Sequence, residues 1–262
     1  MRLHHRGAWK RSRVRLVCVI VKRPLTLTLL AALLLTPLPL AAQTIEAVPF
    51  DKQLKLAKVG DVDAQFAVGL AYESGREGAV DEAEAARWYR QAALQGQVEA
   101  QYRLARLVTK GAKGLKKDPA TGLKLFTDAA IKGYAPAMNA LGVIYQTGQG
   151  AAVDLAKAAD WYRKAADLKL AEAENNLGMM YLNGKGLDRD LVEAFKLFDR
   201  AATQGDGWGL NNLGGMYEMG WGTAPNRDKA LDLYRQALAK GVASAQANID
   251  RLSAPAPQAQ SQ

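Results

Sequence analysis

Histidine and cysteine are almost missing from this chain of 262 residues: His4, His5 and Cys18 are the only ones, and all lie near the N-terminus. A product that begins near residue 43 contains neither residue type. Such a product cannot form disulfides, Cys/His zinc sites, Ser-His-Asp triads or Cys-His nucleophiles. We therefore expect a protein that is not an enzyme and that has no catalytic residues, no cofactor and no metal.

A basic surface is also missing from most of the chain. Of the formal charge of +9, +8 arises within residues 1–42, which hold eight lysines or arginines and no acidic residue. The remainder carries 27 basic and 26 acidic residues, a net charge of +1. A charge-balanced chain lacks the positive field that attracts phosphate backbones. We expect no nucleic-acid partner.

Residues 1–42 have the layout of a secretory signal peptide. The basic pair Lys22-Arg23 precedes an apolar run that two prolines interrupt, and Ala41-Ala42 stands where signal peptidase would cleave. The sequence therefore predicts a periplasmic or secreted protein with no stable membrane insertion after cleavage.

Two alternatives apply to the N-terminal segment. An uncleaved anchor is disfavoured, because a short run with two prolines makes a poor transmembrane helix. The basic region is long for a signal peptide, so residues 1–20 could instead reflect a misassigned start codon.

Glycines recur through the rest of the chain every 36 or 37 residues, which is typical of a repeat protein. They stand at Gly60, Gly96, Gly133, Gly205 and Gly241, with Lys169 at the remaining place. We number the five units that they define one to five: residues 60–96, 97–133, 134–169, 170–205 and 206–241. Outside them we expect an N-terminal cap helix in 43–59, a C-terminal half-repeat in 242–252 and a disordered tail in 253–262.

Each unit has the pattern of two amphipathic helices, with apolar residues at i, i+3 or i+4, and i+7. The second helix of each unit begins at a capping residue: Asp81, Asp118, Asp154, Asp190 or Asn226. It carries a bulky pair such as Trp161-Tyr162, whereas the first helix has small residues at two repeated positions. Small residues allow helices to cross closely while the bulky pair fills the space between them. The expected fold is all-α.

The repeated pattern resembles the Sel1-like repeat, a relative of the tetratricopeptide repeat. Residues 137–150, AMNALGVIYQTGQG, and 154–166, DLAKAADWYRKAA, match it almost position for position. The resemblance covers residues 60–253. It implies a right-handed α-solenoid of five helix-turn-helix repeats with capping half units, whose first helices line a concave groove.

One repeated position of the first helices, which we call a column, is a candidate partner-binding surface. It holds Asn139, Asn175 and Asn211 in units three to five, and Phe66 and Tyr102 in units one and two. The family resemblance implies that this column faces the groove, where asparagine side chains can bind an extended peptide backbone. The alternative is that the asparagines form structural hydrogen bonds between repeats.

Unit five carries three large apolar residues, Trp208, Met219 and Trp221, at places that are mostly polar in the other units. Tryptophan is enriched in binding hot spots, so these residues are candidate anchors for a partner. The alternative is that the C-terminal half-repeat or the tail covers them.

Unit two has a one-residue insertion in its internal loop, and this loop is basic. It contains Lys110, Lys113, Lys116 and Lys117. The loop could contact lipid headgroups, an acidic glycan or an acidic protein, or it could simply be solvated.

These observations favour a periplasmic scaffold or regulator that binds a partner protein or peptide through the groove or an edge of the solenoid. What the resemblance implies for the partner is a membrane sensor or an envelope complex, for example in exopolysaccharide control. The alternative function is a binder or hydrolase of cell-wall glycan or peptidoglycan-related ligands.

Overall fold

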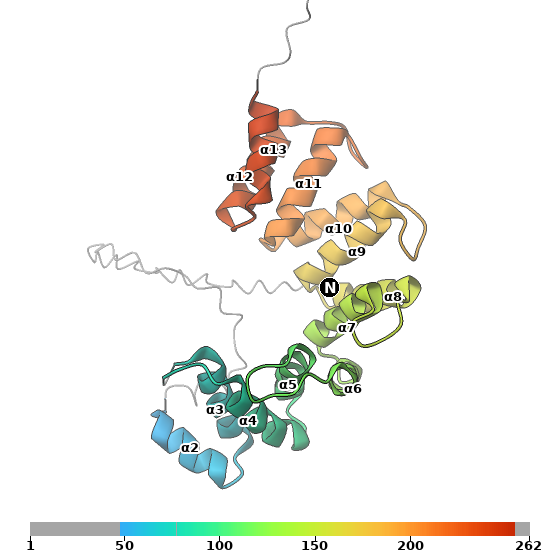
Figure 1. The fold of residues 1–262 in the computed structure, drawn as a ribbon. Helices are drawn as coiled ribbons and strands as arrows, with labels where there is room; N and C mark the ends of the chain where they lie inside the picture. Colours follow the sequence, from blue (N-terminus) through green and yellow to red (C-terminus); the bar gives the residue numbers. More distant parts are fainter. Residues whose placement is uncertain (1–47, 77, 255–262) are drawn as a thin grey trace, which may run out of the picture. The chain divides into compact units, whose positions relative to one another are not determined.

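The computed structural model describes residues 48–76 and 78–254, and these residues form twelve helices that follow one another along the chain (Figure 1). The predicted signal peptide, residues 1–42, lies outside the described residues, as do residues 255–262 of the predicted tail. The all-α solenoid expected from the sequence is confirmed.

Ten of these helices, each of 13 residues, alternate as the first and second helices of the five units. The first helices are α3 (Val62–Ser74), α5 (Val98–Lys110), α7 (Ala135–Thr147), α9 (Ala171–Asn183) and α11 (Gly207–Met219). The second helices are α4 (Glu82–Leu94), α6 (Pro119–Ile131), α8 (Leu155–Asp167), α10 (Leu191–Thr203) and α12 (Arg227–Ala239). A single helix precedes them, α2 (Phe50–Lys58), and a single helix follows them, α13 (Ser244–Ser253).

Each helix packs mainly on its neighbours in sequence, and α9 also contacts α11. Contacts of this kind build a stack in which each repeat is stabilised by the adjacent repeats. Residues at equivalent places of successive repeats therefore line up along the stack.

The helix boundaries follow from capping chemistry. All five second helices begin after a residue whose side chain accepts a backbone N–H of the first turn: Asp81, Asp118, Asp154, Asp190 and Asn226. Most first helices end at a glycine in the left-handed conformation, as Gly148 does with φ of 79°. In unit three these two devices join α7 to α8 through a short loop.

The turn between units three and four departs from the glycine pattern. Lys169 has φ of 61°, and it is the one non-glycine residue with positive φ among the described residues. The other turns between units have glycine at this place, and Gly133 has φ of 87°. A side chain in this region of φ is strained, so Lys169 has a conformational cost that the glycines avoid.

The core repeats one contact, an aromatic ring of the second helix on a small residue of the first. A Cβ atom on Gly142 would lie 2.5 Å from the ring of Tyr162, and one on Gly69 would lie 2.6 Å from the ring of Tyr89. The same contact joins Phe198 to Gly178. The second small position recognised in the sequence is therefore where the two helices of a unit approach closely, whereas Gly209, at the first small position, packs on Ala201 of the preceding unit.

Where the aromatic residue of the second helix is a tyrosine, its hydroxyl group donates a hydrogen bond to a side chain of the first helix. Tyr162 Oη donates to Gln146 Oε1 at 2.6 Å, and Tyr234 Oη donates to Glu218 Oε2 at 2.8 Å. In unit four the ring is Phe198, which needs no acceptor, and Leu182 stands at the equivalent place. The residue types at these two positions change together because a buried hydroxyl needs an acceptor.

A buried carboxylate ties units three and four together. Glu174 is only 1% exposed, and its oxygens accept hydrogen bonds from Arg200 Nε at 2.7 Å and Gln204 Nε2 at 2.6 Å. Arg200 also donates to the carbonyl of Ala166 at 2.9 Å. A buried charge with two donors is satisfied, and this network holds the end of α8 against α9 and α10.

Candidate functional site

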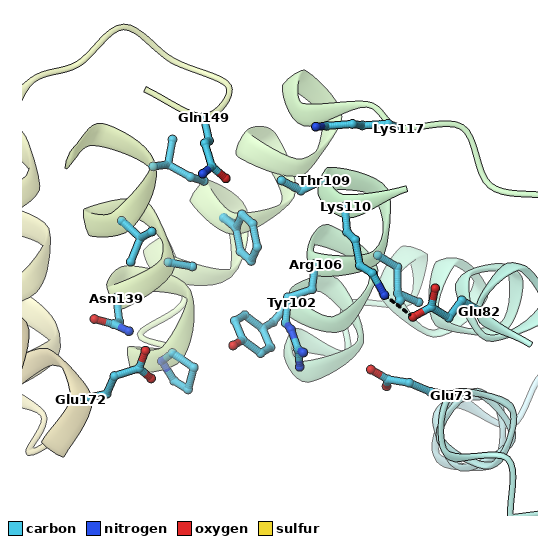
Figure 2. Close-up of a pocket in the computed structure, with 16 residues that line it drawn as sticks. Glu73, Glu82, Tyr102, Arg106, Thr109, Lys110, Lys117, Asn139, Gln149 and Glu172 are labelled. Carbon is cyan, nitrogen blue, oxygen red and sulfur yellow. Dashed lines mark hydrogen bonds and ion pairs between the residues drawn. The ribbon is translucent and has the colours of Figure 1, made fainter. Parts of the chain in front are cut away.

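A solvent-open cavity of about 560 Å³ lies between the first helices of units two and three. Tyr102 and Arg106 of α5 lie on one side and Asn139 of α7 on the other, with Glu172 of α9 at one end (Figure 2). Two of the predicted binding residues, Tyr102 and Asn139, thus line the same cavity. We call the surface of the first helices that lines it the groove face.

The cavity lies beside the place where unit two lacks the pairing of ring hydroxyl and acceptor. At the equivalent places it has Phe126 and Thr109, and both line the cavity. Threonine is shorter than the glutamate or glutamine of units one, three and five, and it packs against Gly122 of α6, where an added Cβ atom would overlap Thr109 Oγ1. Thr109 Oγ1 is buried and has no hydrogen-bond partner among the described residues. Sequence reasoning missed this site, although the changed residue pair was visible in the repeats.

Most of the acidic groups around the cavity are already paired. Lys110 Nζ lies 2.8 Å from Glu82 Oε1, and Arg103 Nη1 lies 3.0 Å from Glu73 Oε2. Glu73 also accepts a hydrogen bond from Tyr89 Oη at 2.5 Å. Salt bridges and hydrogen bonds of this kind hold the side chains at the edge of the cavity next to α3.

The wall formed by α5 combines an aromatic ring with a cation. The guanidinium carbon of Arg106 lies 5.9 Å from the ring centroid of Tyr102, and Arg106 has no ion pair within the described residues. Burial raises the pKa of Tyr102, so its hydroxyl stays protonated at neutral pH. The cavity therefore presents neutral hydroxyl and amide groups next to an uncompensated guanidinium.

The asparagine column is mainly a connection between repeats. Asn176 donates to Asn139 Oδ1 at 3.0 Å, and Asn212 donates to Asn175 Oδ1 at 2.8 Å. Both acceptor residues are buried, at 4% and 8% exposed. The third predicted asparagine, Asn211, accepts from Asn248 at 3.1 Å in the same way. The structural alternative left open by the sequence therefore accounts for the oxygens of all three residues.

Phe66 must be corrected as a partner-binding candidate. Its side chain is 1% exposed, with the ring of Tyr89 at 5.7 Å and the guanidinium of Arg103 at 5.8 Å from its centroid. Phe66 and Arg103 occupy the same pair of repeat positions as Asn139 and Asn176. A ring covered by the next repeat joins units one and two, and it cannot contact a partner.

The three candidates of unit five do not form one patch. Trp208 and Met219 are 55% and 56% exposed, whereas Trp221 is partly buried and packs on the core of α10, α11 and α12. Trp208 and Met219 lie at the two ends of α11, about 16 Å apart along its axis. Eleven residues make about three helical turns, so both side chains project from the same side of α11.

The exposed side of α11 continues the groove face. Trp208 stands at the repeat position of Pro136 and Glu172, and Met219 stands at the position of Lys110. All three equivalent residues line the cavity. The repeat symmetry therefore places the two exposed apolar residues of unit five on the surface that contains the cavity further along the stack.

The described residues contain no group of three or more histidine, cysteine or carboxylate side chains that could bind a metal ion. Within the same residues, no helix combines the length and the apolar character that a membrane span requires.

The sequence profile described as the Sel1 repeat matches most of the described chain. The matches cover residues 62–97, 98–134, 135–170, 171–206 and 209–242. They agree with the resemblance inferred from the motifs of unit three.

Several known proteins are similar to the chain. Chitin synthase regulatory factor 3 of Schizosaccharomyces pombe is 34% identical over 119 residues, which are 45% of this chain and 13% of that protein. A protective antigen of uropathogenic Escherichia coli, described as displaying an SLR fold, is 33% identical with a TM-score of 0.70 over 78% of this chain and 44% of that one. The chain thus spans less than half of the length of either protein.

A Sel1 repeat protein from Oxalobacter formigenes has 24% identity and a TM-score of 0.68, over 79% of this chain and 90% of that one. At this identity the similarity shows the fold alone.

Proposed function

The chain belongs to the Sel1 repeat family, and we propose that it is a non-catalytic scaffold or regulator that binds a partner protein along the groove face of its first helices. Sel1 repeats generally mediate interactions between proteins. The signal-like segment at residues 1–42 supports a periplasmic or secreted location.

One observation carries the proposal: Trp208 and Met219 are more than half exposed on the surface that elsewhere lines the cavity. Exposing a large apolar side chain to water is unfavourable, and tryptophan is prominent among residues that dominate binding energy. A partner lying along the groove face would cover both side chains.

A regulatory role fits the name of one relative. Chitin synthase regulatory factor 3 shares 34% identity over 119 residues. By analogy, the partner of this chain would be a component of an envelope complex, such as a membrane sensor or a polysaccharide-producing system.

Site-specific photo-crosslinking tests the proposal. The full chain is expressed in its native host with a photoreactive amino acid in place of Trp208, Val143 or Lys124. Trp208 and Val143 belong to the groove face, whereas Lys124 is exposed on α6. We expect the same protein to be crosslinked at the two groove positions and absent at Lys124, as identified by mass spectrometry.

Two companion variants test the anchors. Trp208→Ala and Met219→Ala remove exposed side chains, so both should fold normally and weaken crosslinking at Val143. Trp221→Ala is unsuitable, because Trp221 packs on the core. Crosslinking at Lys124 alone would contradict the groove, and binding of peptidoglycan fragments that depends on Trp208 would favour the glycan alternative.

A further inference from the structure

The cavity between α5 and α7 has two unpaired cations at its edge. Arg106 and Lys117 both line it, and neither has a carboxylate partner among the described residues. Of the lining carboxylates, Glu82 pairs with Lys110, and Glu73 shares Arg103 with Glu99. Only Glu172, at the far end, stays unpaired, so the end of the cavity next to unit two is positive.

The backbone of the loop in unit two is constrained around Lys117. Ala112 and Leu115 exchange two backbone hydrogen bonds, of 3.0 and 2.9 Å, and the N–H of Asp118 donates to the carbonyl of Val108 at 2.7 Å. A Cβ on Gly111 would lie 2.8 Å from the Cβ of Lys117, so the backbone around Lys117 is closely packed. The lysine therefore projects over the cavity from a constrained position (Figure 2).

Further positive charge surrounds this place. Lys113 and Lys116 belong to the same loop and are exposed. The loop that carries the one-residue insertion thus holds three exposed lysines, of which Lys117 lines this cavity and Lys113 lines a neighbouring pocket beside Asp81 and Glu82. Charges in such a cluster attract an anionic group and raise its rate of association.

The apolar lining of the cavity and the amide group of Asn139 are suited to binding a polypeptide. Val143, Ile144 and Phe126 give the cavity an apolar floor. Asn139 accepts with its Oδ1 from Asn176, but its Nδ2 donates to no described residue and points toward the cavity (Figure 2). A free amide donor above an apolar floor can bind a backbone carbonyl while an apolar side chain fills the space.

We propose that this cavity receives an acidic segment of the partner protein, with an Asp or Glu carboxylate at Arg106 and Lys117 and a neighbouring apolar side chain on the floor. The inference rests on the proposed function and names the chemistry of the partner. The apolar floor and the carboxylate of Glu172 disfavour a polyanion such as a nucleic acid, whose charge would extend along the whole cavity.

Selection from a random peptide library tests the proposal. A library of displayed 12-residue peptides is selected on the immobilised full chain, and the enriched sequences are read by sequencing. We expect enriched peptides to contain Asp or Glu next to an apolar residue. Binding of one such peptide, followed by fluorescence anisotropy, should weaken about tenfold with Lys117→Glu, because the substitution replaces attraction by repulsion.

Matched variants separate a specific site from general charge effects. Lys124→Glu makes the same change of charge on α6, outside the cavity, and should leave affinity unchanged. Arg106→Gln should weaken binding without reversing charge. Circular dichroism and thermal unfolding verify that each variant folds.

Three results would overturn the inference: neutral or basic enriched peptides, acidic peptides that bind equally to the Lys117→Glu protein, or no enrichment at all. The crosslinking result at Trp208 does not depend on any of these three results. A failed peptide selection therefore contradicts only the acidic-segment inference, whereas missing crosslinks at Trp208 and Val143 contradict the proposed function itself.

Discussion

Single glycines determine how closely the helices of one unit pack. Gly142 lies under the ring of Tyr162, which is fully buried and held by its hydrogen bond to Gln146. A methyl group there would have to displace the ring or separate α7 from α8. We expect Gly142→Ala to lower the free energy of unfolding by about 2 kcal/mol, measured by urea denaturation, as overpacked cores do.

Gly215 is the matched control for Gly142. It lies in the middle of α11, and the nearest atom to an added Cβ would be Tyr234 Oη at 3.6 Å, an ordinary contact distance. Because alanine is a better helix former than glycine, Gly215→Ala should raise the free energy of unfolding by about 0.5–1 kcal/mol. Equal effects at the two sites would contradict the packing argument.

Pairs of polar residues connect successive first helices. Asn139 and Asn176 join α7 to α9, and equivalent pairs join α9 to α11 and α11 to α13. A half-buried amide pair contributes about 1 kcal/mol beyond the two separate side chains. We expect a double-mutant cycle of Asn139→Ala and Asn176→Ala to give a coupling energy of about 1 kcal/mol in urea denaturation.

Asn183 provides the control for this cycle. Its amide donates to the carbonyl of Met179 within α9, and it has no contact with Asn139. The cycle of Asn139→Ala and Asn183→Ala should therefore give a coupling energy near zero. A coupling of equal size in both cycles would show that Asn139 acts through the general stability of the stack, and not through its bond to Asn176.

Buried tyrosines along the whole stack make the stability of the molecule sensitive to alkaline pH. Burial raises the pKa values of Tyr89, Tyr162 and Tyr234 above the ordinary value of 10.0. The unfolded chain ionises near pH 10 while the folded chain holds these protons, so the stabilisation is complete below pH 10 and is lost above it. For each tyrosine whose pKa is strongly raised, the free energy of unfolding falls by about 1.4 kcal/mol between pH 9 and pH 11.

Tyr162→Phe isolates one of these contributions. At pH 8 the variant should be less stable than the parent, because the hydrogen bond to Gln146 is lost. From pH 9 to pH 11 the difference between the two proteins should shrink by about 1.4 kcal/mol, as measured by urea denaturation at each pH. A constant difference would mean that Tyr162 ionises equally in the folded and unfolded states.

The repeat, its helices and its contact positions were readable from the sequence. A period of 36 or 37 residues, capping residues such as Asp154 and the small residue Gly142 are local features. A repeat protein is stabilised by contacts between neighbouring units, so local patterns suffice to predict most of its packing. The all-α solenoid follows from these patterns without any long-range information.

The roles of individual groove residues needed the tertiary structure. Phe66, Tyr102 and Asn139 share one repeat column, yet Phe66 and Asn139 are buried, at 1% and 4% exposed, while Tyr102 is only partly buried. The covering residue is Arg103 at the first position and the small Ala140 at the second. Exposure at a repeated position depends on the side chain that the following unit places against it, and only packing in three dimensions decides that.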